Sequence, residues 1–389
     1  MSVTYAQGFS ATGLAAGISS VPGKLDLALV VNEGPLDVAA GVFTSNRFCA
    51  APVQWSREVV KTGHAQAVAV NSGCANACTG AEGLAQSRET AQVLATLLGT
   101  TADEVLVGST GLIGELLPLD HVLAGVKKAF PQLADTEDAG VLASQAIMTT
   151  DTLPKRVQID GEGYKLGGMV KGSGMIAPQL ATMICVLTTD AVVSPEQADK
   201  ALRAATSTSF DRIDVDGCMS TNDTVLLLAS GASGVSPNME EFTANVTDAC
   251  AQLARKIVGD GEGSSHDIRV TVTTASSEAA ALACARSVAA SNLFKCAVAG
   301  NDPNWGRIVS SIGTVPPSVA PYDPAKVTVD VNGIRVCDGG MPGQSRELVD
   351  MTPREVHVDI ALNAGSDEAT IWTDDLTHEY VKINSDYES

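Results

Sequence analysis

Short apolar runs alternate with longer amphipathic segments along most of the chain. The runs are rich in β-branched residues or alternate apolar with polar positions, which is typical of strands. They predict strands at residues 25–31, 38–43, 67–70, 104–107, 182–187, 223–228, 268–273, 326–330, 355–361 and 379–383. The last of these would make the tail of the chain strand-like.

Helices are expected where apolar residues recur at helical spacing. The clearest covers 239–257, where the residues on one face are Phe242, Val246, Cys250, Leu253 and Ile257. Residues 82–98 predict a second helix that stops at Gly99. Further helices are expected after Pro118 and at 138–148 and 195–207. Strands and helices therefore alternate on both sides of the chain's midpoint.

The length of the chain allows two domain-sized units. Its 389 residues can bury large cores, and the composition is that of a globular protein with few aromatic residues. The proline-rich stretch 315–324 is either a linker or a surface loop. If it is a linker, a smaller C-terminal subdomain begins at about residue 320.

Charge and residue spacing exclude several classes of protein. The formal net charge of -20 disfavours nucleic acid and anionic membranes as partners. The nine cysteines argue against a disulfide framework, and the five histidines are too scattered for a metal motif, so we expect no metal. No apolar run reaches membrane-spanning length and the first residues carry no targeting pattern, so we expect a cytoplasmic protein.

The middle of the chain places one hydroxyl, that of Thr182, between a loop rich in Gly and Pro and an apolar strand. The preceding Ala181 is small, which leaves its carbonyl open to attack by this hydroxyl. Cleavage between the two residues would give Thr182 a free α-amine, which titrates near ~8. Nucleophile and general base would then share one residue. The alternative is that Thr182 is an ordinary core threonine.

Two hydroxyl-bearing segments could serve acyl chemistry at Thr182. The turn Ser109–Thr110–Gly111 follows a strand and could present a hydroxyl and a backbone N–H to a developing oxyanion. On its own, such a turn is more often only a turn. Thr149 and Thr150 follow a predicted helix, where capping and turn formation are the alternative role.

Two other segments could meet a substrate. Glu262 lies in the acidic, glycine-rich loop 260–265, which lacks the lysine of a phosphate-binding loop and could face a cationic group instead. The tail either frays, as chain ends usually do, or folds into a site and places Asn384 and Ser389 against a ligand.

Seven motifs occur in an order that resembles one family. They are Ser109–Gly114, Met148–Thr152, Lys171–Met183, Ser220–Thr224, Asp260–Gly263, Asp302–Ile308 and Tyr380–Asn384. Through them nearly the whole chain resembles the ornithine acetyltransferases, or glutamate N-acetyltransferases, of arginine biosynthesis. The chain departs from the expected pattern at Cys74, at the pair Cys218–Met219 and at Ser389, which keeps the hydroxyl of the more common threonine.

The resemblance implies an α/β fold, an α+β layered sandwich of the ornithine acetyltransferase and DmpA-like type. It implies self-cleavage between Ala181 and Thr182 into an alpha chain, 1–181, and a beta chain, 182–389, which stay entwined in an α2β2 assembly. It implies small amino acids as substrates and no cofactor, with acetyl-CoA left open as a second acetyl donor.

The resemblance also assigns roles to residues. Thr182 would carry the acetyl group from N2-acetylornithine to glutamate in a ping-pong reaction, and Thr110 with Gly111 would form the oxyanion hole. The substrate contacts would be Thr149 or Thr150, Lys171, Thr182, Glu262, Asn384 and Ser389.

Two rival functions remain at this stage. An N-terminal-nucleophile aminopeptidase or amidase would pass the acyl group to water, so added glutamate would not be acetylated. An acidic binding protein for small amino acids would remain one uncleaved chain. A denaturing gel and an acetyl-transfer assay therefore separate the three functions.

Overall fold

The computed structural model describes residues 2–177 and 183–386, and these form two compact units. Unit 1 is built from described residues of Met1–Asp211 and Cys218–Ile257. Unit 2 is built from those of Arg212–Gly217 and Val258–Tyr387. The chain therefore leaves unit 1 for one short strand, returns, and leaves again.

Unit 1 contains two sheets among its described residues. The first has the order β1 (Phe9–Leu14), β2 (Leu27–Asn32), β4 (Ala67–Cys74) and β5 (Val105–Leu112). The second has the order β3 (Val38–Phe43), β10 (Thr224–Ala229), β8 (Ile184–Thr189), β7 (Lys165–Lys171) and β6 (Lys155–Asp160). Their facing sides share one apolar core, to which Val30, Val68, Val186 and Leu226 contribute.

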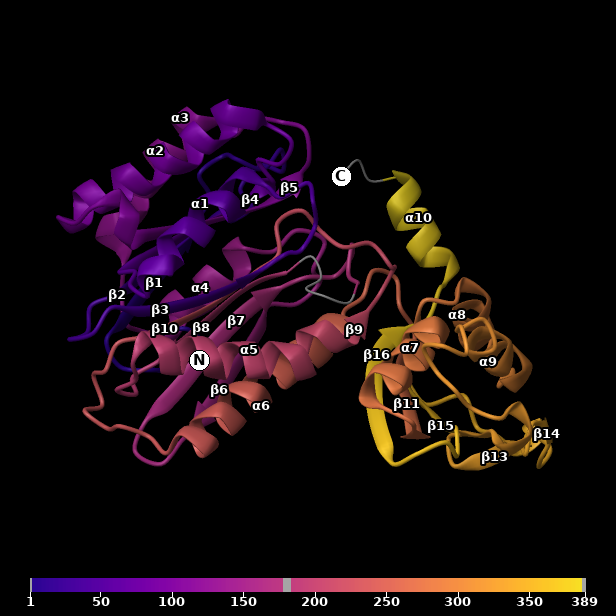
Figure 1. Ribbon diagram of the computed structural model, residues 1–389. Coiled ribbons are helices and arrows are strands. Elements are labelled where there is room, and N and C mark those ends of the chain that lie inside the picture. The colour runs from indigo at the N-terminus through magenta and orange to yellow at the C-terminus, as the bar shows by residue number, and fades with distance from the viewer. Residues whose placement is uncertain (1, 178–182, 387–389) are drawn as a thin grey trace. The chain divides into compact units, whose positions relative to one another are not determined.

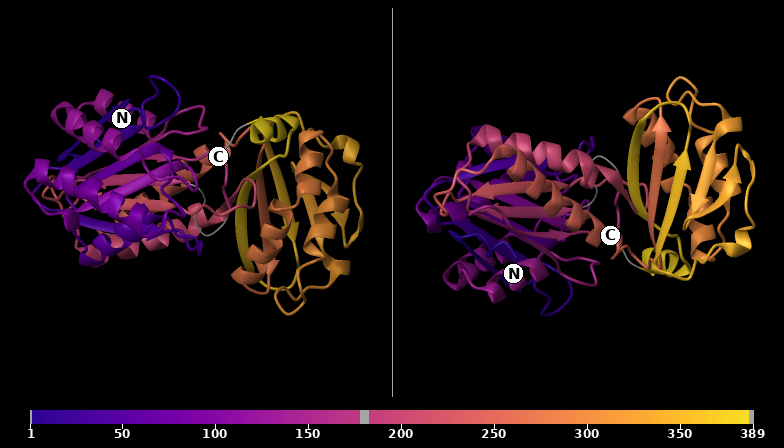
Figure 2. Two further views of the ribbon diagram at one scale, coloured as in Figure 1. Left: turned by 90° about the horizontal axis from the view of Figure 1, so that it is seen from above. Right: turned by 90° about the horizontal axis from the view of Figure 1, so that it is seen from below.

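Helices of unit 1 cover the outer face of each sheet, which gives four layers (Figures 1 and 2), while one helix, Glu137–Ala146, contributes Ala143 and Ala146 to the core between the sheets. The helices are α1 (Ala51–Val59), α2 (Gly80–Leu98), α3 (Leu119–Ala129), α4 (Glu137–Ala146), α5 (Pro195–Thr208) and α6 (Met239–Val258). Leu94 of α2 and Val126 of α3 pack on the first sheet, while α5 contacts β3 and β10 of the second. The interior of unit 1 is therefore apolar on both faces of each sheet.

The second sheet interleaves segments from both sides of residue 182. Strands β3, β6 and β7 precede that residue, and β8 and β10 follow it. Six residue pairs join β7 to β8 in antiparallel register, from Lys171–Ile184 to Leu166–Thr189. Six antiparallel pairs also join β10 to β3. The halves of the chain thus share one hydrogen-bonded sheet.

Unit 2 contains one seven-stranded sheet among its described residues. Its order is β14 (Met341–Pro342), β13 (Ile334–Asp338), β12 (Thr328–Val331), β15 (Glu355–Ala361), β11 (Asp267–Ala275), β16 (Asp367–Asp374) and β9 (Ile213–Asp214). Its helices are α7 (Glu278–Ala289), α8 (Asn292–Ala299), α9 (Trp305–Ile312) and α10 (His378–Asp386). Residues of α7, α8 and α9 join the apolar core of the sheet. Strands β11 and β15 accordingly alternate buried and partly exposed residues.

Short 3₁₀ helices complete the described secondary structure. They are η1 (Val60–Thr62), η2 (Ala102–Glu104), η3 (Phe130–Gln132), η4 (Phe210–Arg212), η5 (Pro324–Lys326) and η6 (Arg346–Leu348).

The prediction of a strand at 379–383 is wrong, because this segment lies in helix α10. The run of apolar residues is too short to distinguish the two-residue period of a strand from the 3.6-residue period of a helix. The start of the helix explains the outcome: the Tyr380 N–H donates to Thr377 Oγ1 at 3.2 Å, as in an N-terminal cap. Thr377 Oγ1 in turn donates to the Gly263 carbonyl at 2.6 Å, which ties the helix to the 260–265 loop.

The compact units are divided differently from the expected pieces. Unit 2 begins its long segment at Val258, well before residue 320, and strands on both sides of the proline-rich stretch 315–324 join one sheet. The boundary between 1–181 and 182–389 concerns cleavage of the chain rather than packing, so it stays a prediction.

Candidate active site

The prediction that Ser109–Thr110–Gly111 form a turn after a strand is wrong, because these residues lie inside strand β5 and pair with Asn71–Gly73 of β4. The last of the three has a backbone conformation that favours glycine. Gly111 has φ +131°, and a β-carbon added there would lie 2.3 Å from the Gly73 carbonyl carbon on β4. Strand β4 runs parallel to β5, and the register shifts at Gly73 and Cys74, beside the 109–111 segment. Close packing of the two strand ends therefore fixes the conformation of the 109–111 segment.

Lys171, at the end of β7, contacts the 109–111 segment of β5. Its Nζ donates to Thr110 Oγ1 at 3.2 Å, and both side chains are almost fully buried. Because Thr110 Oγ1 accepts this hydrogen bond, its own proton remains available for another acceptor. A buried ammonium group beside a hydroxyl is a suitable arrangement for stabilising negative charge on an oxygen atom.

Asn222 holds the 109–111 segment through its side-chain amide. Its Nδ2 donates to the Ser109 carbonyl at 2.8 Å and to the Ala75 carbonyl at 2.7 Å. Ser109 Oγ donates to Asn71 Oδ1 at 2.6 Å. These bonds link β4, β5 and the segment before β10, so the 109–111 segment is held by contacts from distant parts of the sequence.

The same residues surround the start of β8, which follows Thr182 closely in the chain. Gly108 packs against Ile184, since a β-carbon at Gly108 would lie 3.5 Å from Ile184 Cδ1. Ile184 pairs with Lys171 on β7 and with Thr224 on β10. The structure thus brings together the predicted residues Thr110, Gly111 and Lys171 beside the first described residues after position 182.

Asp151 orders the segment that contains the two predicted threonines. Its carboxylate accepts from Lys155 Nζ at 2.6 Å, from the Gly172 N–H at 2.7 Å and from the Thr149 N–H at 3.0 Å. Burial alone would raise the pKa of Asp151, but the ammonium groups of Lys171 and Lys155 and the Gly172 N–H outweigh it and lower that pKa. The ionised carboxylate ties the 149–151 segment to the residue after Lys171.

Thr149 and Thr150 themselves are half-buried, and the structure leaves the choice between them open. The Thr149 carbonyl accepts from Lys24 Nζ at 3.0 Å, so its backbone is held at both polar atoms. Ala181, Thr182 and Ser389 lie outside the described residues. Their predicted roles stay predictions.

Two other predicted residues meet in unit 2. Asn384 Nδ2 of α10 donates to Glu262 Oε2 at 2.8 Å, and Glu262 is 9% exposed. Burial and the carboxylates of Asp216 and Glu262 raise the pKa of Tyr380, whose hydroxyl donates to Asp216 Oδ2 at 3.3 Å. The pair Glu262–Asn384 therefore lies in an acidic region, the kind of surroundings that a cationic group would favour.

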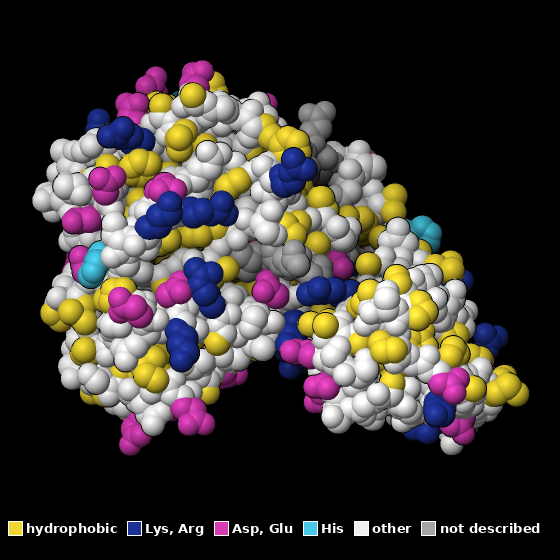
Figure 3. All heavy atoms as spheres, in the orientation of Figure 1, with side chains coloured by type: hydrophobic (Ala, Val, Ile, Leu, Met, Phe, Trp, Pro, Cys, Tyr) yellow, Lys and Arg dark blue, Asp and Glu magenta, His cyan; other side chains and the backbone are white. Residues whose placement is uncertain are grey.

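Other surfaces of the described structure point less clearly to chemistry. A cavity of about 630 Å³ between β3, η1 and α5 has Arg57, Lys61 and Arg203 in its lining but none of the predicted site residues. On the face seen in Figure 3, Lys and Arg side chains lie among Asp and Glu side chains. Among residues 2–177 and 183–386, no cluster of His, Cys, Asp and Glu is suited to a metal ion, and no helix is long and apolar enough to cross a membrane.

The sequence pattern did not assign roles to Asn222 or Asp151. Both lie inside motifs that carried the family resemblance, Ser220–Thr224 and Met148–Thr152, and that membership was the available signal. Their contacts with residues 109 and 172 depend on the tertiary fold.

The layered fold and the Lys171–Thr110–Gly111 arrangement define the class, an α/β enzyme that transfers acyl groups. More specifically, the chain belongs to the ArgJ family, whose model matches residues 10–389.

Two curated relatives agree with this assignment over their full length. The chain is similar to the "Arginine biosynthesis bifunctional protein ArgJ" of Bifidobacterium longum, at 72% identity with 100% of both chains covered. It is 54% identical to the protein of the same name from Streptomyces avermitilis, again over 100% of both chains. A solved ornithine acetyltransferase complexed with ornithine, from Mycobacterium tuberculosis, is 48% identical over 47% of this chain and 96% of its own, with a TM-score of 0.45.

Proposed function

We propose that this chain transfers the acetyl group of N2-acetylornithine to glutamate, giving ornithine and N-acetylglutamate in arginine biosynthesis. The observation that carries the proposal is the buried Lys171–Thr110 contact beside the start of β8. It occurs in a chain that is 72% identical to a bifunctional ArgJ protein over the whole of both sequences. The word bifunctional supports a second activity, acetylglutamate synthesis with acetyl-CoA as donor.

The proposed reaction begins with cleavage between Ala181 and Thr182, which frees the Thr182 amine. Thr182 Oγ then bonds to the acetyl carbon, and its proton passes to that amine. As the bond between the acetyl carbon and nitrogen breaks, the proton moves to the departing nitrogen of ornithine. In the second half the amine of glutamate attacks the acetyl-threonine ester, and the bond between the acetyl carbon and Thr182 Oγ breaks. The proton lost by the glutamate amine passes through the Thr182 amine to Thr182 Oγ.

Thr110 and Gly111 stabilise the oxyanion in both halves of the proposed reaction. Thr110 Oγ1 accepts from Lys171, so its hydroxyl proton can point toward the oxyanion, next to the Gly111 N–H. The Lys171 ammonium adds positive charge and pairs with the α-carboxylate that ornithine and glutamate share. Glu262 and Asn384 would bind the cationic end of ornithine, while Thr149 or Thr150 and Ser389 would contact the bound amino acid.

The cleaved pieces would remain together and assemble as α2β2 in the cytoplasm, without a cofactor or metal. The shared sheet of β3, β10, β8, β7 and β6 supports the retention of both pieces after cleavage. The rival aminopeptidase or amidase activity would use the same nucleophile with water as the acceptor.

Replacing the nucleophile tests the proposal. Thr182→Ala should abolish both cleavage, measured by intact mass, and formation of N-acetylglutamate from N2-acetylornithine and glutamate. Thr188→Ala is the matched control, since Thr188 is a buried threonine on β8 whose hydroxyl donates to the Val3 carbonyl at 2.8 Å. An unbroken parent chain with full transferase activity would contradict the proposal, and acetate release without acetylglutamate would favour the amidase.

A further inference from the structure

Asp223 lies directly beside the backbone that follows Thr182. Strands β8 and β10 run parallel with Ile184 opposite Thr224, so the residues that precede them, Met183 and Asp223, are neighbours. Asp223 Oδ1 accepts from the Met183 N–H at 3.2 Å, and the Met183 carbonyl accepts from the Thr224 N–H at 3.0 Å. Both polar atoms of the Met183 backbone are therefore held by this segment.

The second carboxyl oxygen of Asp223 has no partner among the described residues. Asp223 is 0% exposed, and its Oδ2 makes no hydrogen bond with them. The nearby Thr44 hydroxyl donates instead to the Ser220 carbonyl at 2.6 Å. A buried polar atom without a hydrogen-bond partner lowers the stability of the fold. We therefore expect a partner for Oδ2 other than the described residues.

The surroundings of Asp223 favour its neutral form. Burial raises the pKa of Asp223 well above its ordinary value, although the Met183 N–H, the hydroxyls of Thr44 and Ser220, and the Lys171 ammonium on β7 oppose the shift. A neutral carboxylic acid keeps one oxygen as an acceptor and turns the other into an O–H donor. The Met183 N–H already donates to Oδ1, which is therefore the acceptor oxygen. The O–H donor of the neutral acid is then at Oδ2.

We propose that Asp223 is a positioning residue for the nucleophile: one carboxyl oxygen holds the Met183 amide, and the other supplies a hydrogen-bond donor for the reactions of Thr182. Met183 N is covalently bonded to the carbonyl carbon of Thr182, so Asp223 holds the backbone atom that directly follows the proposed nucleophile. The inference rests on the proposed function, because it assigns Asp223 a role only if Thr182 is the nucleophile. Asp223 itself exchanges no proton with the substrate.

Removing the donor and restoring it with an amide tests the role. Asp223→Ala should slow cleavage and transfer by about 10²-fold, the scale of a lost donor at a reacting group. Asp223→Asn supplies an N–H at the same position and should keep both rates within about fivefold of the parent, the effect of one altered hydrogen bond. Asp190→Asn is the control for a buried aspartate at the other end of β8, where it accepts from Gln7 and Lys165 amides.

The pH profile separates positioning from a merely structural role. The parent should lose activity at alkaline pH as Asp223 ionises and can no longer donate, whereas Asp223→Asn should lack this limb. Asp223→Asn as slow as Asp223→Ala would mean that the carboxylate acts as a base, and Asp223→Ala at the parent rate would mean that it has no role. Either result overturns the inference. If Asp223→Ala fails to fold, the Asp223→Asn rates and profile still decide.

The two proposals fail in different ways. If the proposed function is wrong, the parent chain itself makes no acetylglutamate. If only the role of Asp223 is wrong, the parent remains cleaved and active, while the Asp223 variants depart from the pattern above.

Discussion

Each unit buries a lysine–aspartate ion pair, but the two pairs lie in opposite electrostatic surroundings. In unit 1, the Asp151 cluster sets one carboxylate against two lysines, Lys155 and Lys171. In unit 2, the Asp374 cluster sets one ammonium, that of Lys295, against the carboxyls of Asp374 and Asp214. Similar burial therefore yields a fixed charge in one unit and a titratable group in the other.

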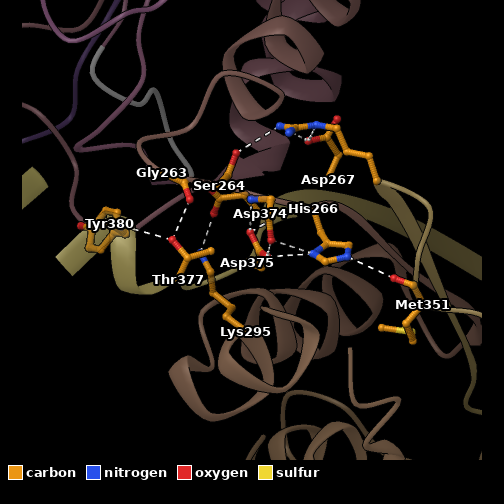
Figure 4. A network of polar contacts seen from close by, with 12 residues as sticks. Gly263, Ser264, His266, Asp267, Lys295, Met351, Asp374, Asp375, Thr377 and Tyr380 are labelled. Atoms are coloured by element: carbon orange, nitrogen blue, oxygen red, sulfur yellow. Dashed lines mark hydrogen bonds and ion pairs between the residues drawn. The ribbon is translucent and has the colours of Figure 1, made fainter. Parts of the chain in front are cut away.

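The Asp374 cluster binds protons more readily because its acids outnumber its lysine. Lys295 Nζ donates to Asp374 Oδ1 at 2.8 Å (Figure 4), and it also donates to the Val215 carbonyl. Burial nevertheless raises the pKa of Asp374 to about 7 and that of Asp214 to about 6, with Lys295 opposing both shifts. In the Asp151 cluster two ammonium groups outweigh the same burial effect. The local balance of charges, rather than depth, decides the protonation state.

Breaking the Asp151 cluster should have the largest effect on stability. Asp151→Ala leaves two buried lysines without their shared carboxylate, which should lower the free energy of unfolding by about 3–5 kcal/mol. Denaturant titration measures this loss. The matched control is Asp199→Ala, whose partner Arg203 lies at 2.9 Å in an exposed pair, where about 0–1 kcal/mol is expected. Equal losses in the two variants would contradict the distinction.

The two clusters should respond to pH in opposite directions, and the expected change in the free energy of unfolding is smaller than that of Asp151→Ala. The pKa of Asp374 is raised in the folded state, so its contribution is present below its unfolded pKa and is lost as pH rises through about 7. Asp374→Asn should remove part of the loss of stability between about pH 4 and 7, on the order of 1–3 kcal/mol. The pKa of Asp151 is lowered, so its contribution is instead lost as pH falls.

Tryptophan fluorescence can follow unit 2 selectively. Of the three tryptophans, Trp55 lies in α1 of unit 1, whereas Trp305 and Trp372 lie in unit 2, so a Trp55→Phe background isolates the second unit. A pH dependence of unit 2 that Asp374→Asn leaves unchanged would remove Asp374 as its source.

The smallest effect on stability is expected for an exposed ion pair on the surface of unit 1. Glu58 and Lys61 lie 2.7 Å apart on α1 and η1, with side chains that are 68% and 65% exposed. Glu58→Ala should change the free energy of unfolding by no more than about 0.5 kcal/mol, and added salt should reduce even that. Thermal unfolding at low and high ionic strength measures the change. A loss near that of Asp151→Ala would show that exposure does not matter here.

Much of the fold could be predicted from local pattern. The expected strand at 38–43 coincides with β3, and the expected helix at 239–257 differs from α6 by one residue at its end. The family, the layered α/β fold and acetyl transfer in arginine biosynthesis, all expected from the motifs, are confirmed. The assignment of Arg212–Gly217 to unit 2 could not be predicted, because β9 joins that unit only by pairing with β16.

The site residues that belong to a recognisable motif could be predicted from the sequence. Those whose role depends on contacts between distant segments could not. Thr110, Gly111 and Lys171 follow from the resemblance, and the structure places them together. Asp151 and Asp223 gain their surroundings from Gly172 and Met183, which are distant in sequence. Burial and net local charge decide what these acids do, and neither quantity can be read from a stretch of neighbouring residues. The roles assigned to the site residues stay predictions.

The alternation of early and late segments in the second sheet of unit 1 has a practical consequence. Strand β8 lies between β7 and β10, and β10 pairs with β3 on its other side. A cut before residue 182 would therefore leave two polypeptides joined by main-chain hydrogen bonds. These bonds link β7 to β8 on one side of the β8–β10 pair and β3 to β10 on the other. They could not be exchanged between molecules by dilution alone, and an affinity tag on either polypeptide would recover both. Each polypeptide therefore supplies strands without which the sheet of the other would be incomplete.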